Sequence, residues 1–226
     1  VPYVQVGNAQ EATGYLAAAY HDFPSRKLTV IGVTGTDGKT TTSTLIQGLL
    51  GKQRVGLIST VSAHLGDQTV DTGFHVTTPD AHDVQSYLAK MVKAGLTHVV
   101  LETTSHGWSQ HRVDACEFDI AVVTNITHEH MDEHGGYENY RAAKARLFES
   151  LTWTRTKPQG NPRLGVINFD DKKSFDFLNE FIKTKKINYG LGEGSDVRGM
   201  NIEYSPSGIH FTAVSKDFRV ATSSNL

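Results

Sequence analysis

Residues 28–41 read LTVIGVTGTDGKTT, and this stretch decides the fold of the chain. Leu28–Val33 is a short apolar run, which predicts a buried β-strand, and Thr40–Leu50 has the pattern of a helix. Between them, a glycine-rich turn leads into Gly-Lys-Thr-Thr where the helix should begin. Such a turn lets backbone N–H groups point at phosphate oxygens, and a helix N-terminus favours negative charge. The stretch therefore predicts a strand, a phosphate-binding loop and a helix.

The loop supplies the first candidate site residues. Lys39 is expected to contact the β- and γ-phosphates of a bound nucleotide, and the Thr40 hydroxyl is expected to ligate Mg²⁺. Val33 stands where the strict P-loop pattern has glycine, so a glycine-rich turn with an incidental lysine is the alternative interpretation. The predicted nucleotide-binding residues are Gly35, Thr36, Asp37, Gly38, Lys39, Thr40 and Thr41.

Outward from this loop, predicted strands and helices alternate along the chain. Strands are predicted at 54–59, 97–101, 120–123 and 163–168, a hairpin at 61–76, helices at 80–94, 137–151 and 172–182, and short strands after Lys186. The polar run 154–162 predicts a surface loop. The alternation predicts an α/β fold of the P-loop NTPase type, with a mostly parallel sheet, helices on both faces and a small extra β region near the C-terminus. Ligands bind outside the carboxyl ends of parallel strands, so the polar segments that follow these strands are expected to form the site.

Composition excludes several other classes of protein. The 226 residues carry 22 Lys plus Arg against 24 Asp plus Glu, a formal net charge of −2, so a broad nucleic-acid-binding face is not expected. The single Cys116 excludes an internal disulfide framework and a multi-cysteine zinc site, and it fits a reducing compartment. No apolar run approaches the ~20 residues that span a bilayer. The start at Val1–Val4 resembles neither a signal peptide nor an initiator Met, so we expect a part of a longer protein.

Three further segments, together with the loop, carry a resemblance to a known family. They read LETTSHGWSQHR at 101–112, TNITHEHMDEHG at 124–135 and YRAAKARLF at 140–148. In this order after VTGTDGKTT (33–41), they resemble the motifs of the Mur ligases, the ATP-dependent amide-forming enzymes of peptidoglycan precursor synthesis. The segment 101–112 is similar to the signature of the branch that adds the third amino acid. This chain departs from the family pattern at Trp108, Glu129 and Met131, and Thr104 stands where the family usually has serine, which keeps the hydroxyl.

The resemblance implies a domain organisation. Residues 1–27 correspond to the end of an N-terminal UDP-binding domain or to a linker, residues 28–226 correspond to the central ATP-binding domain, and the C-terminal ligase domain is absent. We therefore expect this chain alone to be inactive. The amino acid that is added, whether lysine, meso-diaminopimelate or another, stays open because the missing domain would select it.

The resemblance also implies a reaction. The γ-phosphoryl group of ATP would pass to the D-Glu carboxylate of UDP-N-acetylmuramoyl-L-Ala-D-Glu, and the amine of the amino acid would then attack the acyl phosphate. The implied enzyme is cytoplasmic, uses ATP and Mg²⁺, and serves cell-wall synthesis, and thereby cell shape and division. We expect a monomer without nucleic-acid or membrane partners.

Metal-site roles follow from the resemblance too. Glu102, at the end of a predicted strand, and His130 are implied to hold Mg²⁺ beside Thr40. His130 and Lys39 are also implied to be catalytic, with Lys39 on the phosphates of ATP. Carboxylate oxygens suit a hard cation, whereas a surface or cap position is the alternative for Glu102. The three histidines of 128–134 raise the possibility of zinc, but the phosphate loop and the carboxylate favour magnesium. His128 and His134 are not expected to be ligands.

The predicted muropeptide contacts are Thr77, Thr78, Thr104, Ser105, Gln110 and Arg112. Arg112 can pair bidentately with a substrate carboxylate, and a surface salt bridge is the alternative. The segment Thr77–Pro79 can also be a simple turn before the helix, with Thr78 or Asp80 as its cap.

Lys144 lies within an apolar stripe of the predicted helix 137–151, four residues after Tyr140 and four before Phe148. A lysine there either extends its amine to solvent or is modified. The resemblance implies that Lys144 is carbamylated, and that it is catalytic and a Mg²⁺ ligand. An ammonium would repel the cation, whereas a carbamate presents two oxygens and a negative charge.

Two other functions agree with the same loop. One is another ligase of this superfamily, such as folylpolyglutamate synthetase or a different peptidoglycan ligase. The other is a non-catalytic nucleotide-binding module, against which the combination of Lys39, Glu102, His130 and Lys144 argues. A switch GTPase is disfavoured because the chain has no Asn-Lys-x-Asp stretch to bind guanine.

Overall fold

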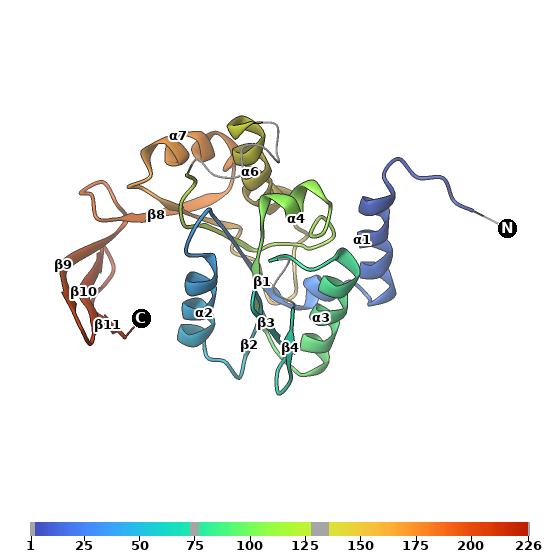
Figure 1. Ribbon diagram of the computed structural model, residues 1–226, viewed down its shortest axis with the longest axis horizontal. Helices are drawn as coiled ribbons and strands as arrows, with labels where there is room; N and C mark the ends of the chain where they lie inside the picture. The colour runs from blue at the N-terminus through green and yellow to red at the C-terminus, as the bar shows by residue number, and fades with distance from the viewer. Residues whose placement is uncertain (1–2, 73–76, 128–135, 226) are drawn as a thin grey trace.

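The structure is a computed structural model that describes residues 3–72, 77–127 and 136–225. Within these residues one mixed sheet runs through the molecule (Figure 1) in the order β11-β10-β9-β8-β7-β6-β1-β5-β2-β3-β4. The strands are β1 (Thr29–Thr34), β2 (Val55–Ile58), β3 (Ser62–His64), β4 (Thr69–Asp71), β5 (His98–Glu102), β6 (Ile120–Val123), β7 (Leu164–Asn168), β8 (Lys185–Gly190), β9 (Val197–Ser205), β10 (Gly208–Ser215) and β11 (Arg219–Ser224). The helices are α1 (Ala9–Tyr20), the 3₁₀ helix η1 (Pro24–Lys27), α2 (Lys39–Leu50), α3 (Ala81–Lys93), α4 (Ser105–Ser109), α6 (Tyr137–Trp153) and α7 (Lys172–Phe181).

The centre of the sheet is parallel, as the sequence predicts. β1 pairs in parallel with β5 and β6, and the parallel pairing continues outward through β2 on one side and β7, β8 and β9 on the other. The predicted hairpin forms as the antiparallel pair β3–β4, and the predicted C-terminal β region forms as the antiparallel strands β9–β11. In Figure 1 these last strands extend to one end of the molecule, opposite α1.

Helices cover both faces of the sheet because the buried strands are apolar on both sides. One face of β1 carries Ile31 and Val33, which pack in a cluster that includes Ile46 of α2. The other face carries Val30, which belongs to the larger cluster formed with α3, α6 and α7. Within the described residues, no helix is long and apolar enough to cross a membrane.

Two parts of the chain differ from the sequence-based expectations. The polar loop expected after Leu101 contains the short helix α4, which Thr104 caps by accepting from the Gly107 N–H at 2.9 Å. The run 154–162 is not simply a surface loop, because Lys157 is 3% exposed. Its amine forms a buried ion pair with Asp119 and donates to the Leu28 carbonyl at 2.9 Å. Local composition could not indicate this pairing, since the partners lie far away in the sequence.

Candidate functional site

Three parallel strands end at the same edge of the sheet, and the polar segments follow them there. β1 leads into the phosphate loop, β5 ends at Glu102, and β6 leads into Thr124 and Asn125. The register pairs Val33 with both Glu102 and Val122, so these three strand ends lie side by side. This is the position at which α/β sheets bind ligands.

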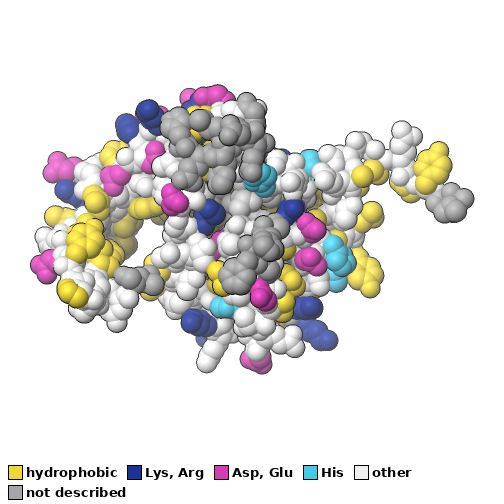
Figure 2. Space-filling model, viewed as in Figure 1, with side chains coloured by type: hydrophobic (Ala, Val, Ile, Leu, Met, Phe, Trp, Pro, Cys, Tyr) yellow, Lys and Arg dark blue, Asp and Glu magenta, His cyan; other side chains and the backbone are white. Residues whose placement is uncertain are grey.

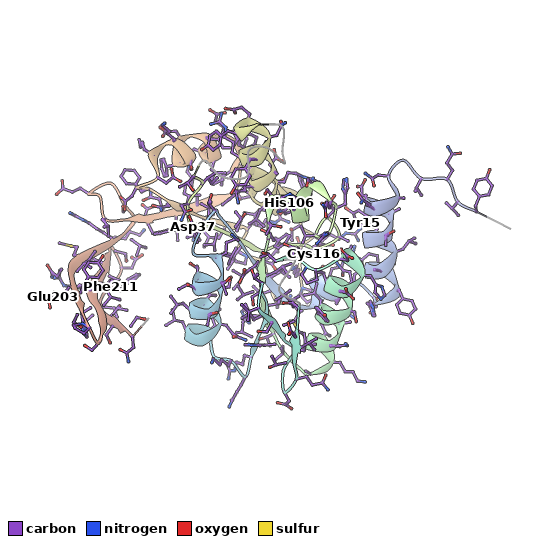
Figure 3. All side chains as sticks on the ribbon, viewed as in Figure 1. Tyr15, Asp37, His106, Cys116, Glu203 and Phe211 are labelled. Atoms are coloured by element: carbon purple, nitrogen blue, oxygen red, sulfur yellow. The ribbon has the colours of Figure 1, made fainter. Side chains whose placement is uncertain are left out.

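The phosphate loop is held by the segment that follows β6. Thr36 N–H donates to the Asn125 carbonyl at 2.8 Å, and the Thr124 hydroxyl donates to the Asp37 carbonyl at 2.6 Å. Gly35 has a φ of +149°, and a Cβ added there would lie 1.8 Å from Thr124 Oγ1. The loop can approach β6 this closely only because position 35 is glycine. Figure 3 shows Asp37 at the N-terminal end of α2.

Lys39 and Thr40 open α2, as the sequence predicts. Gly38 is the N-cap with a φ of +76°, and the Lys39 ammonium donates to the carbonyl oxygens of Gly35 at 3.1 Å and Thr36 at 2.7 Å. The amine therefore lies over the loop, where a phosphate group would replace these carbonyls as its partner. The Thr36 hydroxyl lies 3.1 Å from the Tyr140 hydroxyl, which joins the loop to α6.

Glu102 is a buried carboxylate beside the start of α2. Its Oε2 accepts from the hydroxyls of Thr40 and Thr60, each at 3.1 Å. Burial raises the pKa of the Glu102 carboxyl, and the two hydroxyls and the Lys39 charge offset this in part. Among the described residues its Oε1 is buried without a hydrogen-bond partner. Glu102 is thus neither a surface nor a cap glutamate.

These groups fit a hard divalent cation. An unsatisfied carboxylate oxygen and an adjacent threonine hydroxyl are the donor types that Mg²⁺ prefers. The part of the chain that the structure describes contains no group of three or more His, Cys, Asp or Glu placed to hold a metal. The predicted metal ligand His130, together with His128 and His134, lies outside the described residues.

Lys144 is buried in α6, as its position in the apolar stripe predicts. Its side chain is among the largest fully buried ones, and its amine donates to the Gly35 carbonyl at 2.7 Å. The amine also lies 4.5 Å from the centre of the Tyr140 ring. The amine of Lys144 thus reaches the phosphate loop and does not extend to solvent.

A second group of predicted residues gathers around Thr78. The Thr78 hydroxyl donates to the Glu102 carbonyl at 3.2 Å and lies 3.1 Å from the Thr104 hydroxyl. Arg112 donates to the Thr78 carbonyl at 2.6 Å and lies 3.4 Å from the Asp80 carboxylate. Asp80 is the N-cap residue of α3, as that alternative has it, although its side chain makes no capping hydrogen bond. Thr78 therefore connects Arg112 to the strand end that carries Glu102.

Arg112 also faces a cavity of about 340 Å³. The cavity is lined by Gln10, Thr13, Asp80, Ala81, His82, Gln110 and Arg112. The predicted contact residue Gln110 is thus brought to the same cavity, whereas Ser105 is 4% exposed at the start of α4. Thr77 is partly buried next to Thr78. On the face shown in Figure 2, basic and acidic side chains are interspersed.

Sequence reasoning missed Thr124 and Tyr140, which hold the phosphate loop, and two further contributors to this site. Thr60, which donates to Glu102, follows β2 and so lies at the same sheet edge, a signal that was available from the predicted strand 54–59. The other contributor is the Asn125 side chain, which accepts from the Asp37 N–H at 3.1 Å. Asn125 is far from the loop in the sequence, so no local pattern indicated this contact.

This geometry defines an α/β nucleotide-binding domain of the P-loop type. It consists of a strand, a glycine loop and a helix, with a buried carboxylate beside the first hydroxyl of the helix. Comparison with known proteins identifies its family. Residues 33–226 match the Mur ligase middle domain, and the chain belongs to the Mur ligase family.

Curated relatives and solved structures agree with this membership. The chain is 36% identical to a UDP-N-acetylmuramoyl-L-alanyl-D-glutamate–2,6-diaminopimelate ligase of Caldanaerobacter subterraneus subsp. tengcongensis, over 96% of this chain and 43% of the relative. It is 38% identical to a UDP-N-acetylmuramyl-tripeptide synthetase of Roseiflexus sp., over 93% of this chain and 43% of the relative. A solved structure of a diaminopimelate ligase of the first kind has a TM-score of 0.79 and 29% identity, covering 99% of this chain and 46% of that one.

The chain spans less than half the length of these relatives. A solved Mycobacterium tuberculosis folylpolyglutamate synthase, complexed with ADP and AMPPCP, shares the fold with a TM-score of 0.66 at 14% identity, over 90% of this chain and 52% of that one. That likeness is one of fold alone. The two relatives compared above on sequence are a diaminopimelate ligase and a tripeptide synthetase.

Proposed function

We propose that the protein containing this chain is an ATP-dependent ligase that adds the third amino acid to UDP-N-acetylmuramoyl-L-Ala-D-Glu. The observation that supports this most directly is the Thr78 connection. Through its hydroxyl and its carbonyl, Thr78 contacts both the Glu102 strand end and Arg112. A nucleotide on the phosphate loop and an acidic substrate held by Arg112 would thus meet at one sheet edge.

The first step is phosphoryl transfer. A D-Glu carboxylate oxygen attacks the γ-phosphorus, the bond from that phosphorus to the β,γ-bridging oxygen breaks, and ADP leaves. Lys39 stabilises the negative charge that develops on the phosphoryl oxygens, and the loop N–H groups orient them. Arg112 orients the acidic substrate through a bidentate pair. Two anions must approach each other in this step, and the proposed roles of Lys39 and Arg112 would supply a cation for each of them.

The second step forms the amide. The amine of the incoming amino acid attacks the carbonyl carbon of the acyl phosphate, inorganic phosphate leaves, and the amine loses a proton. Glu102 and Thr40 would hold a Mg²⁺ ion, with His130 and Lys144 completing the set as part of this proposal. When bound, the ion neutralises phosphate charge and holds the phosphate oxygens in place. Lys144 would serve as a carbamate, since an ammonium would repel the ion.

The proposal extends to the domain organisation and to the cellular compartment. Residues 28–226 would be the central ATP-binding domain, preceded by the end of a UDP-binding domain or a linker at 1–27. A monomeric enzyme that uses ATP and a UDP-linked precursor would act in the cytoplasm. Thr77, Thr78, Thr104, Ser105, Gln110 and Arg112 are proposed as the muropeptide contacts.

Phosphate release by the full-length protein tests this function. We expect release with UDP-N-acetylmuramoyl-L-Ala-D-Glu plus one amino acid of a panel, and none with muropeptides that lack the D-Glu. Lys39→Ala should lower turnover by about 100-fold or more, the effect of one such electrostatic group. The control Lys52→Ala changes an exposed lysine beyond α2 and should leave turnover unchanged. Release with folates and not with muropeptides would contradict the proposal.

A further inference from the structure

A polar relay beside the cavity begins at α1, and the reaction proposed above uses none of its members. The N-cap residue of α1, Asn8, accepts through Oδ1 from the backbone N–H groups of Gln10 and Glu11 at 2.9 and 3.1 Å. This cap fixes the amide, so its NH₂ group faces His111, with Nδ2 lying 2.9 Å from Nε2. An amide NH₂ group only donates, so His111 Nε2 must accept and the neutral imidazole must carry its hydrogen on Nδ1.

The other ring nitrogen continues the relay to α6. His111 Nδ1 lies 2.6 Å from Asp114 Oδ2, which also accepts from Arg146 of α6 at 3.0 Å. The Asp114 side chain is 8% exposed. Tyr15 of α1, which Figure 3 shows on that helix, donates to the Asp114 carbonyl at 3.3 Å. The imidazole thus joins α1 to a largely buried carboxylate that α6 also contacts.

His111 has this role at a strained backbone position. Its φ is +57°, and it directly follows Gln110, the C-cap of α4. Its N–H donates to the Trp108 carbonyl at 3.2 Å, and the Arg112 N–H donates to the Gly107 carbonyl at 2.8 Å. This is the Schellman arrangement, in which glycine usually occupies the left-handed position. A histidine is strained there, and its side-chain bonds offset the strain.

The relay connects two segments that both line the cavity. Gln110 and Arg112 flank His111 in the sequence and form one wall, and Gln10 and Thr13 of α1 contribute to the other. We propose that neutral His111 is a positioning residue that fixes α1 against the Arg112 turn and so sets the affinity for the anionic part of the substrate. This inference rests on the proposed function, because it takes the cavity to hold part of the muropeptide.

Two variants separate positioning from a structural role in the full-length protein. His111→Gly removes the imidazole and relieves the backbone strain. Asn8→Ser keeps a side-chain oxygen that caps the helix but removes the amide NH₂ group that faces His111. Both should raise KM for the UDP-muramoyl dipeptide by about threefold to tenfold, the loss expected for a hydrogen bond, with kcat changed by less than about twofold. If His111 only shaped the turn, His111→Gly would leave KM unchanged.

Asn8→Asp provides a second test through pH. A carboxylate caps the helix as well as the amide does, but it accepts from the ring and cannot donate to it. A doubly protonated ring would then bridge the new carboxylate and Asp114. Besides Asp114, the ionisable side chains that contact the relay are Tyr15 of α1 and Arg146 of α6, and Glu11 lies in the first turn of α1.

The KM of Asn8→Asp relative to the parent should therefore fall as the pH is lowered from about 8.5 to about 6, where imidazole gains its charge. Asn161→Asp makes the same exchange in the loop after α6 and should follow the parent at every pH. Nitrogen-15 NMR of the parent should show the Nδ1–H tautomer.

An Nε2–H tautomer, or KM values of the Gly and Ser variants within about twofold of an active parent, would overturn the inference. A parent that ligates no amino acid to any muropeptide contradicts the proposed function instead, and the tautomer measurement then still tests the relay.

Discussion

Two amines share one acceptor in the site. Lys39 and Lys144 both donate to the Gly35 carbonyl, at 3.1 and 2.7 Å. Two ammonium groups at one oxygen repel each other, and the repulsion is strong where water is excluded, as it is around Lys144. A carbamate at Lys144 would replace this repulsion with attraction to Lys39.

A pair of Lys144 variants distinguishes a carbamate from a cation. Lys144→Ala in the full-length enzyme should lower turnover by about 100-fold or more, and added short-chain carboxylic acids should partly restore it by occupying the vacated space. Lys144→Arg keeps the positive charge but cannot be carbamylated, so it should be equally impaired and should not be rescued. Lys173→Ala, an exposed lysine in α7, is the matched control. An active Lys144→Arg enzyme would show that a cation suffices.

We expect Glu102 to make the stability of the domain depend on pH and, through the proposed cation site, on Mg²⁺. Because burial raises its pKa in the folded state, the folded chain holds the Glu102 proton more tightly than the unfolded chain does. This contribution to stability is fully present below the ordinary pKa of a glutamate and is lost as the pH rises through the raised folded value. A bound cation should offset the loss at neutral pH by favouring the ionised carboxylate.

Thermal denaturation of Glu102→Gln tests this direction of the pH dependence of stability. Without Mg²⁺ at about neutral pH, the variant should melt about 2–4 °C above the parent, the shift that ~1 kcal/mol causes in a domain of this size. The difference should vanish in acid, where both side chains are neutral. Mg²⁺ should raise the melting temperature of the parent but not of the variant. The exposed Glu203→Gln should behave like the parent in all three conditions. A variant that melts below the parent at neutral pH would refute the argument.

At the scale of elements, the phosphate loop depends on its close approach to the segment after β6. Gly35→Ala would place a Cβ against Thr124 Oγ1, whose hydrogen bond to the Asp37 carbonyl keeps it in place. We expect a loss of about 2–5 kcal/mol in the free energy of unfolding, from backbone strain plus overpacking. Gly95→Ala is the control, since Gly95 also has a positive φ but an added Cβ there meets nothing within 4 Å.

Urea denaturation of the two glycine variants measures this difference. Gly95→Ala should lower the free energy of unfolding only by the cost of placing alanine at a positive φ, about 1–2 kcal/mol. Equal losses in the two variants would mean that the loop can move away from Thr124 at little cost.

Most elements were predictable because large apolar residues mark them with a clear period. α1 was not, because its buried residues are the small Gly14, Ala17 and Ala18, which let it lie close to α3 without an apolar stripe. α4 spans only Ser105–Ser109, too short for a helical period to show. The buried Lys157 was missed for another reason: its partner Asp119 is distant in the sequence, and a polar run gives no sign of a buried ion pair.

At the scale of the whole molecule, the sequence could predict which residues follow the strand ends, and parallel topology then brings those ends together. It could not predict the pairings among them. Several of these contacts join segments that follow different strands. They are the contacts of Thr60 with Glu102, of Asn125 with the phosphate loop, and of Thr78 with Arg112. Such pairings depend on loop conformations that no periodic pattern encodes. The motif order therefore indicated the family, while the geometry of the site required the structure.

A further prediction for the whole molecule concerns the activity of the isolated chain. The 226 residues span 43% of the length of the diaminopimelate ligase they match in Caldanaerobacter. They provide a phosphate loop and an Arg112 cavity, but the proposed amino-acid site would lie on the remainder, whose closure would also exclude water from the acyl phosphate. We expect residues 1–226 alone to bind ATP weakly by calorimetry and to form no ligated product by mass spectrometry, whereas the full-length protein forms it under identical conditions. Tripeptide product from the isolated chain would show that these residues already contain a complete amino-acid site.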